Sequence, residues 1–148
     1  MTKSFRGKLA SGTSEIIRLS TNNGLTGYKI KKLQCITDNP TAYDVEGVVQ
    51  VFTVETAITS VIDFNNPTLI AAGYFTFGNQ PYEVTNAISI FDNVKFNQDI
   101  YITYVDNGGS SRPMNYHIEL EQVKLSLDEA TVATLKDMRG RYTNQDPS

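Results

Sequence analysis

Residues 100–121 read IYITYVDNGGSSRPMNYHIELE and contain the two clearest strand patterns of the chain. All six residues of Ile100–Val105 favour a pleated strand. Residues 116–121 alternate strictly between apolar and polar side chains, which predicts a strand with one buried and one wet face. The intervening glycines and serines predict a flexible loop. We therefore expect these two strands to pair antiparallel as a hairpin.

Working outward, further short strands separated by turns are predicted along the chain. They cover 4–10, 13–19, 26–37, 47–54, 69–77 and a short stretch around 87–91, with a long connection over 55–68. The segment 47–54 is apolar on both parities, which is typical of a central strand covered on both faces. Together these strands predict a mostly β fold, an antiparallel β-sandwich that is jelly-roll-like, with one short C-terminal helix.

Two strands carry local irregularities. In 26–37 the apolar parity changes between Ile30 and Leu33, so we expect a bulge near Lys31-Lys32, because a period-two strand cannot switch faces without one. In 69–77, Gly73 predicts a bulge or a close approach of another chain segment.

The last element has a different period. Ser126 followed by Glu129 matches a capping box, in which each residue satisfies a free N–H group of the other at the start of a helix. Leu127, Ala130, Leu135 and Met138 form an apolar stripe, which predicts a helix over about 127–139. We expect a single domain over 1–140 and a polar tail over 141–148.

The net charge of −3 hides an asymmetry along the chain. Residues 1–32 hold seven Lys or Arg and one acid, whereas the remaining residues hold six basic and fifteen acidic groups. Either the lysines are solvated on strand faces, or the basic segment docks onto an acidic neighbour. Nucleic acid is not expected as a partner, since the domain as a whole is acidic. No apolar run is long enough to predict a membrane span.

Residues with reactive side chains do not form a recognisable catalytic pattern. His117 is the only histidine and is expected on an exposed face or at a sheet edge, while Cys35 in an apolar run is expected to be buried. Glu119 and Glu121 share the solvent face of their strand. The loop acids Asp38, Asp44 and Glu46 lack the spacing of a calcium loop. We therefore predict no catalytic residues, no metal site, no cofactor and no enzymatic activity.

Several segments carry a family resemblance. These are FRGKLA (5–10), EIIRL (15–19), GLTGYKI (24–30), EGVVQVF (46–52), NQDIYITY (97–104), NYHIELE (115–121) and ATVATLKD (130–137). In them the chain resembles small virion structural proteins of marine tailed phages. The resemblance implies a particle component and transfers no catalytic or ligand residue.

Within a virion, the expected role is a capsid decoration or cement protein that acts by adhesion and self-association. The alternatives are a tail, neck or fibre-adaptor component, or a non-catalytic carbohydrate-binding module that contacts host glycans. The expected partners are capsid or tail proteins and further copies of the chain, as a homo-oligomer, and the expected location is the virion. The predicted interface residues are Lys3, Arg6, Lys8, Tyr101 and Tyr104.

Overall fold

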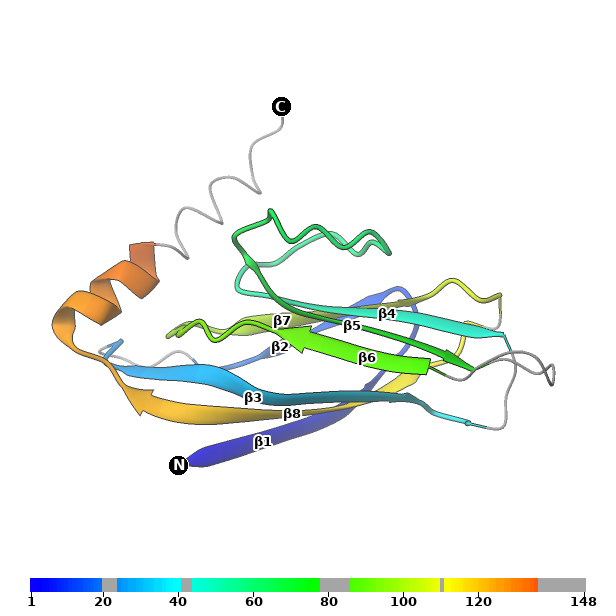
Figure 1. Ribbon diagram of the computed structural model, residues 1–148, viewed down its shortest axis with the longest axis horizontal. Helices are drawn as coiled ribbons and strands as arrows, with labels where there is room; N and C mark the ends of the chain where they lie inside the picture. Colours follow the sequence, from blue (N-terminus) through cyan, green and yellow to red (C-terminus); the bar gives the residue numbers. More distant parts are fainter. Residues whose placement is uncertain (20–23, 41–43, 78–85, 110, 136–148) are drawn as a thin grey trace.

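The computed structural model describes residues 1–19, 24–40, 44–77, 86–109 and 111–135, and within them two antiparallel sheets face each other (Figure 1). The smaller sheet has the order β1-β8-β3, and the larger has the order β2-β7-β4-β5-β6. The prediction of an antiparallel β-sandwich is therefore confirmed. The strands are β1 (Thr2–Leu9), β2 (Thr13–Ile17), β3 (Thr26–Thr37), β4 (Val45–Phe52), β5 (Leu69–Phe77), β6 (Asn86–Phe91), β7 (Ile100–Asp106) and β8 (Met114–Lys124).

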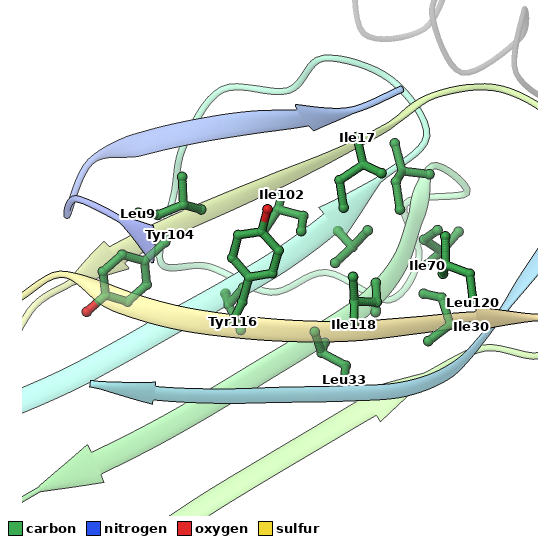
Figure 2. Packing of buried hydrophobic residues seen from close by; sticks show 14 of the residues in the cluster. Leu9, Ile17, Ile30, Leu33, Ile70, Ile102, Tyr104, Tyr116, Ile118 and Leu120 are labelled. Carbon is green, nitrogen blue, oxygen red and sulfur yellow. The ribbon is translucent and has the colours of Figure 1, made fainter. Parts of the chain in front are cut away.

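The core lies between the two sheets and is built from alternate residues of facing strands. Ile118 and Leu120 of β8 meet Ile102 of β7 in this layer, and all three are fully buried (Figure 2). Burying an aliphatic side chain of this size contributes roughly 1.5–3 kcal/mol relative to exposure, so this layer provides the main stabilisation of the fold.

The central strand β4 is covered on both faces, as the sequence predicts. Val49 and Val51 are fully buried between the sheets. On the outer face, the Gln50 amide donates to the carbonyls of Thr59 and Val61, at 3.0 and 3.2 Å, within the long connection between β4 and β5. That connection therefore covers the outer face of the larger sheet at Gln50.

Both predicted strand irregularities are confirmed. The register of β3 against β8 shifts between Ile30 and Lys32, which turns Leu33 back toward the core. In β5, a Cβ atom on Gly73 would lie 2.7 Å from a methyl carbon of Val49, so only glycine fits beneath this side chain. Gly73 thus marks a close approach and not a bulge.

The predicted hairpin between the strands at 100–105 and 116–121 is wrong. The strands β7 and β8 belong to different sheets, and the chain between them crosses from one layer to the other. The crossing is held by the carboxylate of Asp106, which accepts hydrogen bonds from the backbone N–H groups of Glu46, Gly108 and Arg112 at 2.8–2.9 Å. Each strand has one apolar face, and stacking those faces against each other buries both, whereas a hairpin would leave them side by side.

The strand order leaves the jelly-roll prediction unconfirmed. An eight-stranded hairpin rolled into a sandwich pairs β1 with β8, β2 with β7, β3 with β6 and β4 with β5. Three of these ladders are present, but β6 pairs with β5. Between β3 and β6 there is instead a small cavity of about 230 Å³, and the Ser89 hydroxyl donates to the Leu33 carbonyl at 2.9 Å.

The C-terminal helix begins with the predicted capping box. The N–H of Glu129 donates to the Ser126 hydroxyl, and the N–H of Ser126 donates to the Glu129 carboxylate, both at 3.2 Å. Residues 127–135 are helical and project from the end of the sandwich (Figure 1). Of the predicted apolar stripe, Ala130 is buried, but Leu127 and Leu135 are exposed. Met138, the predicted helix end and the polar tail lie outside the described residues.

Candidate binding surfaces

An open groove of about 780 Å³ lies across the outer side of the smaller sheet, where β1, β8 and β3 run side by side. Three consecutive residues from each strand line it, namely 6–8, 115–117 and 34–36. The Cα partners place Arg6, His117 and Gln34 in one row, and Lys8, Asn115 and Ile36 in the next. The groove therefore combines two cationic side chains with polar amides and one imidazole.

The charges at the groove are unevenly balanced. Asp38 is held by Arg112, whose Nε and Nη2 atoms donate to the two carboxylate oxygens at 3.0 and 2.9 Å. Lys8 lies 3.7 Å from the same carboxylate, but its side chain keeps 58% of its exposure. Arg6 is exposed and has no ion pair with any residue that the structure describes. One carboxylate thus serves two cations, and the groove retains positive charge on the β1 side.

His117 forms part of the groove floor and is half-buried on the central strand of the smaller sheet. The prediction of an exposed or sheet-edge histidine is therefore wrong, because β8 has β1 on one side and β3 on the other. Its Nδ1 atom is buried and has no hydrogen-bond partner among the described residues. A buried polar atom of this kind is costly unless a partner or water completes it.

Cys35 and His117 do not form a catalytic pair. Cys35 is the Cα partner of Tyr116, whose side chain points into the core, whereas His117 is on the opposite parity of β8. The two side chains therefore leave opposite faces of the sheet. Burial also raises the pKa of the Cys35 thiol from 9.0 to about 12, so it is not a thiolate at neutral pH.

Two of the carboxylates considered in the sequence, those of Asp38 and Glu121, have cationic partners. Glu121 lies 3.5 Å from Lys29 across the outer face of the smaller sheet, and Lys32 is the Cα partner of Glu119. Asp38 is bound to Arg112, and Glu46 contributes its backbone N–H to Asp106. Across the described ranges, no group of three or more His, Cys, Asp or Glu residues could hold a metal ion.

The five predicted interface residues do not share one surface. Arg6 and Lys8 lie together on the outer face of β1, but Lys3 is on the opposite parity, with its ammonium 5.7 Å from the ring centroid of Tyr28. Tyr101 is half-buried on the larger sheet, as the Cα partner of Phe52. The sequence thus locates one cationic pair and one separate tyrosine.

The prediction that Tyr104 is an interface residue is wrong. Its side chain is fully buried, stacks on Phe75 at 6.0 Å between ring centroids, and donates its hydroxyl to the Arg112 carbonyl at 2.6 Å. Burial, with the nearby charge of Asp106, raises the pKa of this hydroxyl and keeps it protonated as a donor. Tyr104 therefore belongs to the core and cannot contact a partner.

Sequence reasoning missed the exposure of β6. Ile88, Ile90 and Phe91 are 55%, 47% and 38% exposed, and the intervening Ala87 and Ser89 are exposed as well. The signal available was the composition of Asn86–Phe91, which has no charged residue and no proline. That composition predicts an unprotected strand, but only the strand order shows that it lies at a sheet edge.

Comparison with known proteins adds no relative. No protein-family model matches the chain, and no curated protein matches it. Among the described residues, no helix has both the length and the apolar character needed to cross a membrane.

Proposed function

We propose that this protein is a structural component of a viral particle, a decoration or cement protein that attaches to a capsid by adhesion. The observation that carries the proposal is the groove beside β1, where Arg6 and Lys8 lie on the same face of the strand. Arg6 has no ion pair among the described residues, and Lys8 reaches only the Asp38 carboxylate that Arg112 already binds. Such a surface suits an acidic strip on a shell protein, because complementary charge steers and orients docking.

The shape of the groove also favours a protein partner. The groove is open and lies across three strands, so a neighbouring surface can reach both cations at once.

The carbohydrate-binding alternative has weaker support at this groove. Sugar faces stack on aromatic rings, and the only aromatic side chain at the groove besides His117 is that of Tyr116, which points into the core. The amides of Gln34 and Asn115 could bind hydroxyl groups, but they supply no stacking platform.

The test is co-sedimentation of the purified protein with capsids of the encoding virus that lack it. The double variant Arg6→Glu/Lys8→Glu reverses the charge at the groove, and we expect it to lose binding while its circular dichroism stays unchanged. Lys3 is left intact because it lies on the other face of the strand.

A matched control is Lys31→Glu/Lys32→Glu, which makes the same change in net charge on the exposed residues of the opposite edge strand, β3. We expect this control to bind as the wild type does. Wild-type binding by the Arg6→Glu/Lys8→Glu variant, or no binding by the wild-type protein, would contradict the proposal.

A further inference from the structure

The strand β6 is the only one of the four edge strands among the described residues that lacks protection against pairing. Exposed sheet edges offer unpaired backbone groups, and natural proteins shield them with charges, bulges or short strands. The strand β1 carries Lys3, Arg6 and Lys8, and β3 carries three lysines and a bulge. The strand β2 has five residues and includes Glu15, whose carboxylate bonds the buried Tyr116. In contrast, β6 has no charged residue, no proline and no bulge, and it is one residue longer than β2.

The side chains of β6 also lack cover, apart from the Ser89 hydroxyl, which donates to the Leu33 carbonyl of β3 at 2.9 Å. All five from Ala87 to Phe91 are exposed, although three of them are large and apolar. Within the described part of the chain, the ladder to β5 is the only one that holds this strand. A strand with this composition normally buries at least one face, so its exposure indicates a contact that the single chain does not provide.

The hydrogen-bond pattern shows which backbone groups of β6 are open. The N–H of Asp92 donates to the Ile70 carbonyl at 2.9 Å, in register with the β5–β6 ladder. Because antiparallel partners alternate between bonded and non-bonded pairs, Ile90 and Ile88 also direct their backbone groups toward β5. The N–H and C=O groups of Ala87, Ser89 and Phe91 therefore point outward, away from the sheet.

We propose that β6 pairs antiparallel with β6 of a second copy of this chain, joining the two five-stranded sheets across a two-fold axis. A register centred on Ser89 places Ala87 opposite Phe91 and Ile88 opposite Ile90. The outward backbone groups of each copy then bond each other, and the isoleucines form apolar cross-strand pairs.

The lack of charge on β6 suits a second copy as the partner. A two-fold axis places each edge against itself, so self-pairing of β1 would bring Lys3, Arg6 and Lys8 close to identical cations. The strand β6 has no charge and meets no such repulsion. The contact is independent of the groove, which lies on the smaller sheet.

The experiment is size exclusion with light scattering over a concentration series, using the full chain of 16.5 kDa. We expect the wild type to reach twice this mass. Ala87→Pro removes one outward N–H group and leaves the β5 ladder intact, so it should remain at the mass of one chain. Ser4→Pro is the matched control, because it removes an outward N–H from the charged edge of β1, and it should still reach the doubled mass.

A second variant tests the same pairing without a proline, in case Ala87→Pro disturbs folding. Ile88→Lys/Ile90→Lys changes two exposed side chains and leaves the backbone unchanged, yet places lysines opposite each other across the two-fold axis. We expect it to have the mass of one chain. A wild type with the mass of one chain at every concentration would overturn the pairing, as would doubled mass in both the Ala87→Pro and Ile88→Lys/Ile90→Lys proteins.

Discussion

The two sheets of this sandwich differ in the residues that line their open edges. Both edges of the smaller sheet are lined with lysine or arginine, and its outer face holds the basic groove. The larger sheet ends at β6, which has no charge and exposes its isoleucines. We propose that this difference serves two kinds of contact in one small domain, one guided by charge and one by strand pairing.

Long-range electrostatics distinguish the two contacts in solution. Interactions between exposed charges are screened beyond about 8 Å at physiological ionic strength, so docking at the groove should weaken as salt rises. Backbone pairing and apolar contact at β6 involve no charge and should persist. If both proposals hold, raising the salt concentration should release the chain from an acidic surface and leave its pairing with a second copy in place.

The largest expected effect is a difference in the free energy of unfolding between a substitution in the core and one in the edge strand β6. Ile118→Ala removes a fully buried side chain of β8 and should lower the free energy of unfolding by roughly 2–5 kcal/mol. Ile88→Ala removes a side chain that is 55% exposed, and should change the stability of the monomer by less than about 0.5 kcal/mol. Urea denaturation at low protein concentration measures both values. Equal losses in the two variants would show that β6 is covered within the single chain.

A smaller effect concerns the contact between the segment after β6 and the helix after β8. The Lys95 ammonium donates to the Glu129 carboxylate at 2.6 Å, and this bond lowers the pKa of Glu129 below its ordinary 4.5. A lowered folded-state pKa stabilises the protein fully above the ordinary value, and this contribution is lost as the pH falls through the folded-state pKa.

We therefore expect wild type to melt slightly above Glu129→Gln at pH 7, with the gap closing in acid. Glu55→Gln, which removes an exposed carboxylate of the long connection, should show no such gap. Thermal unfolding followed by circular dichroism at pH 7 and pH 3 measures the difference. A difference in melting temperature that widened in acid would contradict a stabilising contact between Lys95 and the ionised Glu129 carboxylate.

The sequence predicts local features of this fold better than its connections. The bulge in β3, the burial of β4 on both faces and the capping box all follow from side-chain parity or spacing within one segment. The β7–β8 hairpin was wrong because parity shows that a strand has an apolar face but not which layer that face meets. The crossing at Asp106 depends on backbone groups of two segments that are far apart in the sequence, β4 and the β7–β8 connection.

The same limit applies to the candidate surfaces. Arg6 and Lys8 are two residues apart on one strand, so their common face could be predicted from the sequence. Their meeting with Gln34 and His117 depends on the order β1-β8-β3, which no local pattern encodes. Tyrosine is a residue type that is common in interfaces, yet Tyr104 stacks on Phe75 in the core.

Residue-resolved amide hydrogen exchange tests the contrast between the two edges most directly. The outward N–H groups of Ala87, Ser89 and Phe91 on β6 should exchange more slowly as protein concentration rises, because pairing with a second copy protects them. The outward N–H groups of Ser4, Arg6 and Lys8 on β1 should exchange at rates that do not depend on concentration. Concentration-independent exchange on β6, or protection on β1 instead, would contradict the assignment of β6 as the pairing edge.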